Sequence, residues 1–299
     1  MGRMHIVITD FNGYDQTRQC LTALHESHFQ EFEILVVDHG TTNKTQKGLS
    51  RDFPHALRVA GPACLWWAGA TNLGIRTALD RGANSIMLIN NDCYVTPSTI
   101  GALVLLSQSN PNSIIAPIQR DWKSGEITAR RATTCFLFGF PTVQLPKCMI
   151  PAVNPPRLLR ANLIFGGRGA LIPRSVFSEI GFLDEDNLPH YGADHDFYLR
   201  ARACGIPMYV APRCIVDIDT TRTTLAESPG RMHVSQFIES FKSVRSHRNL
   251  RDITVLFRKH YPIPKMHYVG IALHTLRYVL VYIISRTLFL LGRKGRGTN

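Results

Sequence analysis

Three short apolar runs in the first third of the chain each end at an aspartate. They are residues 5–9 before Asp10, residues 33–37 before Asp38 and residues 86–91 before Asp92. Because helical segments separate the runs, this alternation predicts a parallel α/β sheet whose strands are buried on both faces. Such sheets bind ligands beyond the carboxyl ends of their strands, so we expect the three carboxylates to face one crevice. Carboxylates that share a crevice repel one another, which indicates a bound cation or a ligand rich in hydrogen-bond donors.

The composition and the cysteines indicate a globular intracellular protein. With 299 residues, 44% of them hydrophobic, the chain can bury one large core or two modest ones. Its seven cysteines are odd in number and form no CxxC pair, which favours reduced thiols over a disulfide framework or a zinc site. We therefore expect a cytoplasmic location. The N-terminus leads directly into the first strand, so no signal peptide is expected.

The positive charge is concentrated at the C-terminal end of the chain. Residues 239–299 carry twelve Lys and Arg residues against two acidic residues, whereas the net charge of the whole chain is +12. A surface that binds nucleic acid would extend onto the folded body, and the sequence contains no RNP, zinc-finger or helix-turn-helix pattern. We therefore expect no nucleic acid among its partners.

Six short motifs follow one another in an order that is typical of one enzyme family. They are residues 6–13 (IVITDFNG), 34–38 (ILVVD), 66–74 (WWAGATNLG), 88–92 (LINND), 166–173 (GGRGALIP) and 190–197 (HYGADHDF). On these motifs the chain, from about residue 4 to residue 261, resembles the family 2 glycosyltransferases and particularly their rhamnosyltransferase-like members. The resemblance implies the GT-A fold, a Rossmann-like α/β fold with a mostly parallel central sheet flanked by helices.

The resemblance also implies how the chain is divided. We expect a catalytic domain over residues 1–235, with the nucleotide-sugar-binding half at about 1–118 and the acceptor-binding half at about 160–220. Residues 236–299 are expected to form a helical, basic extension. Periodicity fades over residues 119–160, so the sequence assigns that segment no role.

In the family, residues after the first strand and the aspartate after the second strand hold the nucleotide. The resemblance assigns that role to Thr9, Asp10, Phe11, Asn12 and Asp38. A carboxylate that accepts the imide N–H of uracil or thymine would favour these bases, because a charged acceptor strengthens the hydrogen bond. The alternative for Asp10 and Asp38 is that they cap loops or the helices that follow.

Two tryptophans and a run of small residues precede a helix that the sequence predicts over residues 71–81. Trp66 and Trp67 are also compatible with the core of the fold. The small residues behind them would allow a sugar or diphosphate to approach the N-terminus of the helix, where free N–H groups favour anions. We assign Trp67, Gly69 and Asn72 to the nucleotide-sugar site, with Asn72 as the side-chain donor.

The third aspartate ends the motif Asn90-Asn91-Asp92, which stands where the family has its metal-binding DxD motif. The resemblance places Asn91 in the nucleotide-sugar site and makes Asp92 a ligand of Mg²⁺ or Mn²⁺, which takes its other oxygens from waters and substrate phosphates. The alternative is that Asp92 is a turn residue. Many relatives add a histidine later, but residues 214–219 contain none. Asp217 or Asp219 is the candidate replacement, although alternation along an edge strand explains both equally well.

The last motif, residues 190–197, carries the acceptor side of the reaction. The resemblance makes Asp194 the general base, which removes the proton of the acceptor hydroxyl as that oxygen attacks the anomeric carbon. Direct attack inverts the anomeric configuration without a covalent enzyme intermediate. We assign Gly167, His190 and Tyr191 to acceptor binding. Asp196 is expected to cap or orient the helix that follows.

The basic extension contains an apolar stretch, residues 269–291, that His274, Arg277 and Arg286 interrupt. Its uncharged stretches are too short to span a bilayer. On a helix, one face would carry Leu273, Leu276, Leu280, Ile283 and Leu291, with His267, His274 and Ser285 opposite. This pattern favours a helix that lies in a membrane interface. The alternative is a helix that packs on the catalytic domain or on a partner subunit.

Together these features predict an inverting, metal-dependent glycosyltransferase. The expected donor is a UDP- or dTDP-sugar, with dTDP-rhamnose favoured by resemblance alone. The expected acceptor is a glycan or lipid-linked molecule of cell-envelope polysaccharide synthesis, at the cytoplasmic face of the membrane. One alternative is a sugar-phosphate nucleotidylyltransferase, but residues 10–13 lack the Gly-rich, basic loop which that class needs. The other is a non-catalytic module that binds a nucleotide sugar or a membrane.

Overall fold

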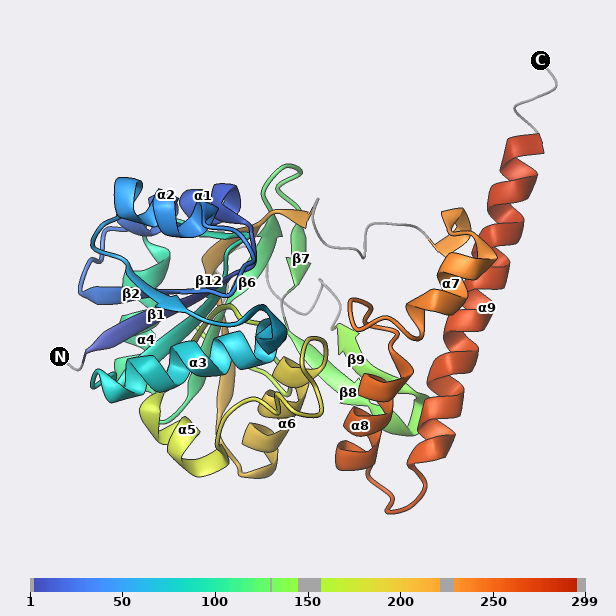
Figure 1. Ribbon diagram of the computed structural model, residues 1–299. Coiled ribbons are helices and arrows are strands. Elements are labelled where there is room, and N and C mark those ends of the chain that lie inside the picture. Colours follow the sequence, from blue (N-terminus) through green and yellow to red (C-terminus); the bar gives the residue numbers. More distant parts are fainter. Residues whose placement is uncertain (1–2, 130, 145–156, 221–228, 295–299) are drawn as a thin grey trace. The chain divides into compact units, whose positions relative to one another are not determined.

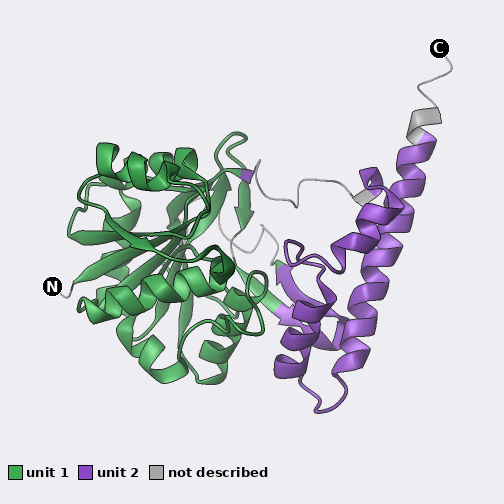
Figure 2. Ribbon diagram, in the orientation of Figure 1, with its two compact units in different colours: residues 1–133, 144–219 green, residues 134–143, 220–299 purple. Residues whose placement is uncertain are grey.

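The computed structural model describes residues 3–129, 131–144, 157–220 and 229–294 (Figure 1). The chain forms two units: unit 1 comprises Met1–Thr133 and Gln144–Asp219, and unit 2 comprises Thr134–Val143 and Thr220–Asn299 (Figure 2). The C-terminal unit thus begins at Thr220 and not at 236, and it includes ten residues of the unassigned segment. Those ten residues belong to unit 2 because the Phe136 ring lies 5.0 Å from the Phe257 ring.

Unit 1 is built around a ten-stranded sheet with the strand order β10-β12-β6-β11-β4-β1-β2-β3, in which β5 pairs with β12 and β7 with β6. The strands are β1 (Met4–Asp10), β2 (Phe32–Asp38), β3 (Leu57–Ala60), β4 (Ser85–Asn90), β5 (Cys93–Val95), β6 (Ile114–Asp121), β7 (Ile127–Ala129), β10 (Leu159–Arg160), β11 (Arg168–Pro173) and β12 (Met208–Ile218). The long strands β1, β2 and β4 pair in parallel, as do β6 and β12, and the antiparallel pairs involve β11 and short strands. This arrangement agrees with the predicted GT-A sheet. Since β12 lies between β10 and β6, it is not an edge strand.

The helices of unit 1 connect these strands. They are α1 (Tyr14–His25), α2 (Lys44–Asp52), α3 (Trp66–Asp80), α4 (Thr99–Ser109), α5 (Arg174–Ile180) and α6 (Ala193–Ala203), with a 3-10 helix, η1 (Ala63–Leu65). Figure 1 shows α1 and α2 on one face of the sheet and α3 on the other. The helix that the sequence predicted over 71–81 begins earlier, at Trp66, so both tryptophans lie in its first turn.

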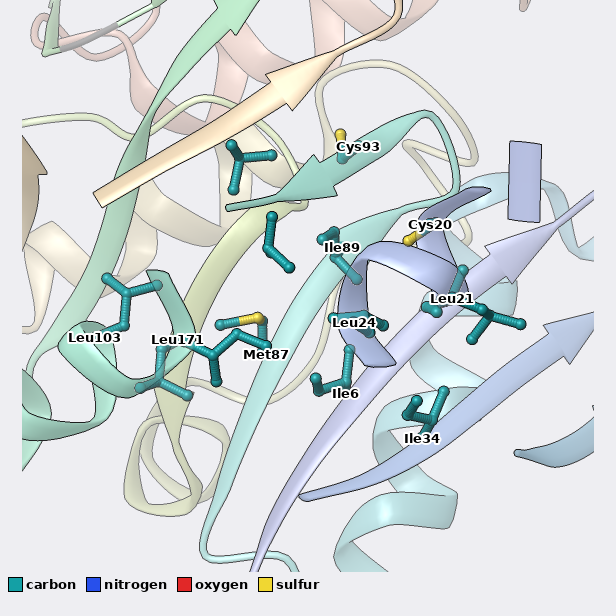
Figure 3. Packing of buried hydrophobic residues seen from close by; sticks show 14 of the residues in the cluster. Ile6, Cys20, Leu21, Leu24, Ile34, Met87, Ile89, Cys93, Leu103 and Leu171 are labelled. Atoms are coloured by element: carbon teal, nitrogen blue, oxygen red, sulfur yellow. The ribbon is translucent and has the colours of Figure 1, made fainter. Parts of the chain in front are cut away.

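Helices cover both faces of β1, which explains why Ile6, Val7 and Ile8 at its centre are all apolar. Ile6 packs with Leu21 and Leu24 of α1 in one buried cluster (Figure 3). On the opposite face, a Cβ atom added at Gly74 of α3 would lie 2.4 Å from Val7 Cγ1. Helix α3 therefore approaches the sheet at a distance that only glycine permits. Burial on both faces leaves the polar residues to gather where the strands end.

Unit 2 consists of helices and one short hairpin. Its elements are β8 (Ala132–Cys135), which begins in unit 1, η2 (Phe136–Phe138), β9 (Phe140–Gln144), η6 (Pro229–Arg231), α7 (Val234–Ser240), α8 (Leu250–His260) and α9 (His267–Lys294). Within this unit α9 packs on α7, where the rings of Tyr282 and Phe237 stack with centroids 4.0 Å apart. On α9, His274 Nδ1 lies 3.0 Å from the carbonyl oxygen of Gly139.

The face of α9 that the sequence predicted to be apolar is the exposed one. Its five members are 38–60% exposed, whereas His274 on the opposite side is 2% exposed. A helix that packs its apolar face into a soluble domain shows the reverse pattern. By length and composition, the segment His267–Leu291 is also long and apolar enough to cross a membrane, which the sequence analysis did not expect.

Candidate active site

The aspartates that end β1 and β2 are neighbours in the sheet, where Asp10 pairs with Asp38. Asp10 is completely buried. Its carboxylate accepts hydrogen bonds from the Gly13 N–H and the Thr45 hydroxyl, each at 3.0 Å, and from the Thr17 hydroxyl. The carboxylate thus ties the end of β1 to α1 and α2. These contacts agree with the alternative, in which Asp10 holds the loop, and the nucleotide contact predicted for Asp10 stays a prediction.

Asp38 is also buried, and a salt bridge joins it to Arg58 of β3, whose Nε lies 2.7 Å from Asp38 Oδ2. The other carboxylate oxygen accepts a long hydrogen bond, 3.4 Å, from the Gly40 N–H. Phe11, which follows β1, is 45% exposed, and its ring centroid lies 5.2 Å from that of His39. This edge of the sheet therefore presents an exposed aromatic ring close to the end of β2, which suits the stacking of a flat base. Thr9 is half-buried at the end of β1.

Asn12 joins two loops at the same edge. Its backbone is left-handed, with φ 59°, and its side-chain oxygen accepts hydrogen bonds from the N–H groups of Thr41 and Thr42 at 3.0 and 3.1 Å. Its amide nitrogen donates to the Thr41 hydroxyl at 3.0 Å. The Asn12 amide therefore holds the loop after β2, and its contact with the nucleotide stays a prediction.

Trp67 explains why the first position of the DxD-like motif is an asparagine. The Trp67 indole N–H donates a hydrogen bond to Asn90 Oδ1 at 3.0 Å. An asparagine amide oxygen accepts this bond without placing a charge there, as an aspartate would. The Asn90 N–H donates to the Gly167 carbonyl at 2.7 Å, and a Cβ atom at Gly167 would lie 2.9 Å from Trp67 Cζ2. Gly167 is thus packed beneath the indole. Its role in acceptor binding stays a prediction.

The N-terminus of α3 is occupied by the chain itself. The Ala68 N–H donates to the Pro189 carbonyl at 2.9 Å, and a Cβ atom at Gly69 would lie 2.9 Å from a carboxylate oxygen of Glu185. Asn72 is completely buried, and its amide pairs with the backbone of Leu183 in both directions, at 2.9 and 3.0 Å. The Asn72 amide therefore holds the loop before α6, and the place of Gly69 and Asn72 in the nucleotide-sugar site stays a prediction.

Asp92 and Asp219 come together where β4 and β12 end. The Asp219 N–H donates to the Asp92 carbonyl at 2.9 Å, and both carboxylates act on the hydroxyl of Tyr94, whose pKa is raised by burial and by these two charges. Asp92 is half-buried, and Asp219 is buried. Asn91 turns away from the pair, because its amide nitrogen donates to the Thr17 hydroxyl at 3.1 Å. The direct nucleotide contact predicted for Asn91 thus competes with a contact inside the fold.

The other candidate for the missing metal ligand, Asp217, is engaged elsewhere. Arg120 of β6 donates to both of its carboxylate oxygens, at 2.6 and 2.8 Å, in a bidentate salt bridge. The salt bridge competes with the metal ion predicted for Asp217, and that assignment stays a prediction. Over the described residues, no group of three or more His, Cys, Asp and Glu side chains could hold an ion. The donor set of Asp92 and Asp219 fits a Mg²⁺-like ion that takes its remaining oxygens from phosphates and waters.

Asp194 lies in the first turn of α6 and pairs with the next residue. His195 Nδ1 lies 3.2 Å from Asp194 Oδ1. Burial by itself would raise the pKa of Asp194, but His195, together with the charge of Arg168, outweighs it and lowers the pKa. Burial acts to lower the pKa of His195, yet Asp194 raises it. Asp194 is therefore held as a carboxylate, the form that accepts a proton.

Arg168 at the start of β11 belongs to the same group of charges. Its charge acts on Asp194 and also on Cys93, the residue after Asp92. Arg168 Nη1 donates to Gln119 Oε1 at 3.0 Å, which orients the guanidinium. One turn after Asp194, the Tyr198 hydroxyl donates to the Gly166 carbonyl at 3.1 Å and so ties α6 to the loop that carries Arg168.

Asp196 orients α6, as the sequence predicted. It is completely buried and accepts a hydrogen bond from Arg200 Nε at 2.8 Å. The guanidinium of Arg200 also donates to the carbonyls of Ile180 and of Phe182, the latter at 2.6 Å. This network fixes the helix, and thus Asp194, against the loop before it.

His190 and Tyr191 lie in an aromatic group at the entry to α6. The His190 ring centroid is 5.9 Å from that of Trp66 and 4.6 Å from that of Tyr191. Both residues are half-buried. Their contact with an acceptor stays a prediction.

Three members of this site were not assigned from the sequence: Arg168, Tyr94 and the partner role of His195. Arg168 stands between glycines in the stretch Gly166-Gly167-Arg168-Gly169. The glycines indicate that the backbone closely approaches another group there. A charge displayed on such a stretch was the signal that could have identified it. Tyr94 and His195 gave no such signal, because the burial that makes their nearby carboxylates important cannot be read from the local sequence.

Comparisons with known proteins agree with this architecture. The family model described as Glycosyl transferase family 2 matches residues 5–181. The chain is 28% identical over 173 residues to the low-salt glycan biosynthesis hexosyltransferase Agl10 of Haloferax volcanii, a match that covers 57% of this chain and 53% of that protein. It is 26% identical over 172 residues to an uncharacterized protein of Mycobacterium bovis, covering 56% of this chain and 59% of that protein. The chain thus spans about half the length of the curated relatives it matches.

Solved structures with a similar fold are far apart from this chain in sequence. GalNAc-T7 with UDP, GalNAc and Mn²⁺ gives a TM-score of 0.61 at 14% identity, covering 73% of this chain and 44% of that chain. The mannosyltransferase PcManGT from Pyrobaculum calidifontis in complex with GDP-Man and Mn²⁺ gives a TM-score of 0.56 at 14% identity, and the match covers 100% of this chain and 76% of that chain. At this identity the likeness establishes the shared α/β fold.

Proposed function

The chain belongs to glycosyl transferase family 2 and has the GT-A fold, and from this premise we propose that it moves a sugar from a UDP- or dTDP-sugar to a glycan or lipid-linked acceptor of cell-envelope polysaccharide synthesis. The exposed Phe11 ring beside Asp38 supports a nucleotide at the β1–β2 edge. The name of its relative Agl10 supports a hexose and a glycan product. The six motifs make dTDP-rhamnose the first donor to test.

The observation that carries this proposal is the group formed by Asp194, His195 and Arg168. In the reaction, Asp194 accepts the proton of the acceptor hydroxyl, whose oxygen bonds to the anomeric carbon while the bond from that carbon to the diphosphate breaks. The attack comes from the side opposite the leaving group, so the anomeric configuration is inverted. His195 keeps Asp194 ionised, since the pair lowers the pKa of the carboxyl.

The leaving diphosphate requires positive charge. Arg168 supplies one charge that is permanent and is already oriented by Gln119. Asp92 and Asp219 would hold a Mg²⁺ or Mn²⁺ ion, which when bound neutralises charge on the diphosphate. Neighbours of the same fold, GalNAc-T7 and PcManGT, were solved with Mn²⁺.

The test is the release of nucleoside diphosphate from UDP-, dTDP- and GDP-sugars with and without Mn²⁺. We expect Asp194→Asn to lower turnover at least about a hundredfold and to leave donor affinity within about twofold. Glu179→Gln, which removes an exposed carboxylate of α5, is the matched control and should behave like the parent. Retained turnover in Asp194→Asn would place the base elsewhere, and Mn²⁺-independent nucleotide binding would contradict Asp92 as a ligand. Nucleotide binding without turnover of any donor would support the non-catalytic module instead.

We also propose that α9 binds the cytoplasmic face of a membrane as a peripheral anchor. Its exposed face is rich in leucine and isoleucine, and a basic group precedes it: Arg245, Arg248, Arg251, Arg258 and Lys259. Arg277 and Arg286 face unit 2, where the Arg277 guanidinium lies 4.2 Å from the centre of the Phe140 ring and Arg286 Nη1 donates to the Gly230 carbonyl at 3.2 Å. A helix lying in the interface keeps these partners out of the hydrocarbon, whereas a spanning helix would draw them in.

Vesicle flotation tests this anchor. The parent should float with phosphatidylglycerol vesicles and less with phosphatidylcholine vesicles, because the basic group adds attraction to anionic lipid. The double substitution Leu276→Asp and Leu280→Asp should reduce binding at least about tenfold, since two exposed leucines are lost from the lipid contact. Leu105→Asp, at an exposed leucine of α4, is the control. Equal flotation of the double variant and the parent would refute the anchor.

A further inference from the structure

The turn between β6 and β7 displays a tryptophan on a rigid support. Trp122 is 46% exposed. The turn is closed by a hydrogen bond between the Asp121 N–H and the Glu126 carbonyl at 2.8 Å, and the Asp121 carboxylate accepts from the N–H groups of Lys123 and Ser124. The Trp122 N–H donates to the Ile218 carbonyl of β12 at 3.2 Å. The indole is thus presented by backbone that is held on both sides.

The exposed indole adjoins the carboxylates of the candidate active site. Its ring centroid lies 6.0 Å from that of Tyr94, edge to face at 75°. Within the described part of the chain, the buried Tyr94 hydroxyl has no hydrogen-bond partner, and Asp219 and Asp92 are the charges that act on it. A single exposed apolar residue is ordinary on a protein surface. A rigid one beside an unpartnered hydroxyl and two carboxylates is a feature typical of a binding site.

The sheet order indicates which ligand reaches this position. β4, which leads to Asp92, separates β1 and β2 from β6 and β12. The proposed nucleotide edge, with Phe11 and Asp38, lies on the β1–β2 side. Trp122 follows β6 and therefore lies on the side of Asp92 away from the proposed nucleotide edge, which leaves that side for the acceptor.

We propose that Trp122, which Tyr94 supports edge to face, forms a platform on which a pyranose ring of the acceptor stacks next to Asp92. This inference rests on the proposed function. The C–H groups on one face of a pyranose carry partial positive charge, which the negative face of an aromatic ring attracts. The Lys123 ammonium lies over the Trp122 ring, 5.7 Å from its centre, so this face of the indole already attracts positive charge, and a bound sugar would take the place of the ammonium there.

Two measurements test the platform. In transfer assays with saccharide acceptors, Trp122→Ala should raise the acceptor KM about tenfold, the loss of one ring contact, and leave donor hydrolysis unchanged. Trp122→Phe should restore part of the affinity, and Leu105→Ala on α4 is the control. Trp122 is one of three tryptophans, so methyl hexopyranosides and short oligosaccharides, titrated with UDP and Mn²⁺ present, should change the fluorescence of the parent and not that of Trp122→Phe.

The outcomes separate this inference from the proposed function. An unchanged acceptor KM in Trp122→Ala overturns the platform, and so does an equal loss of donor hydrolysis, which would assign the indole to the donor. If the parent turns over no nucleotide sugar, the proposed function fails. The fluorescence titration then still decides the platform, because a saccharide response that persists in Trp122→Phe, or is absent from the parent, overturns it.

Discussion

Replacing Asn72 with leucine should destabilise unit 1 strongly and affect nucleotide binding little. The sequence predicted Asn72 as a donor to the substrate, whereas the structure pairs its amide with the N–H and the carbonyl of Leu183, both buried. Leucine fills the same space, keeps water out and leaves both backbone groups without a partner. The two roles therefore predict opposite results.

The magnitude follows from the two unpaired groups. Each buried polar group that loses its partner costs about 1–3 kcal/mol, so Asn72→Leu should cost roughly 2–6 kcal/mol. For a unit of this size, about 2–4 °C per kcal/mol converts a mid-range loss of about 4 kcal/mol into a drop in Tm of about 8–16 °C. Differential scanning calorimetry of the full chain measures the Tm, and titration of UDP with Mn²⁺ measures donor affinity.

A second substitution on the same helix provides the control. The Thr77 hydroxyl of α3 bonds only within the helix, to the Leu73 carbonyl at 2.8 Å among the contacts described. Thr77→Ala should therefore change stability by no more than about 0.5 kcal/mol. If Asn72→Leu melts with the parent and weakens UDP binding tenfold or more, Asn72 contacts the ligand and the reasoning is refuted.

Three further changes test other parts of the site. His195→Ala removes the residue that lowers the pKa of Asp194 while burial raises it. The pKa of Asp194 should therefore rise, and the acidic limb of the pH–rate profile should move to higher pH. An unmoved limb would show that His195 does not control the ionisation of Asp194. Arg168→Met should weaken UDP binding about tenfold or more, because a charge-assisted contact is lost, and calorimetric titration at matched salt measures this. Gly74→Ala should destabilise the protein by about 1–3 kcal/mol, since the new Cβ would lie 2.4 Å from Val7 Cγ1. Its control is Gly101→Ala in α4, where the nearest atom would lie at 3.4 Å; similar urea midpoints for the two variants would contradict the close packing of α3.

The sequence predicted the frame of the site well because the relevant signals are local. The three runs before Asp10, Asp38 and Asp92 became β1, β2 and β4 within one residue at each end. The six motifs identified the family that the family model also matches. The prediction that five apolar side chains share one face of α9 was also confirmed, because helical periodicity alone decides which side chains share a face.

The hydrogen-bond and salt-bridge partners of individual polar residues were harder to predict from the sequence. Asp10 and Asn72 stand at positions where ligand contacts were expected, yet their partners are residues of the chain itself. Thr45 is 35 residues away from Asp10, and Leu183 is 111 residues away from Asn72. Asp217, the candidate metal ligand, is likewise bound at both of its carboxylate oxygens by Arg120, 97 residues earlier.

The sequence by itself determined that apolar strands end in polar residues at one edge of an α/β sheet, because burial imposes a periodicity that can be read along the chain. Only the tertiary structure decided which of those polar residues form hydrogen bonds that hold the loops of the chain itself. Hydrogen bonds and charge pairs depend on distances through space. Such distances bring Trp122 to Tyr94 with no trace in the local sequence pattern, and they let the charge of Arg168 act on Asp194, 26 residues later.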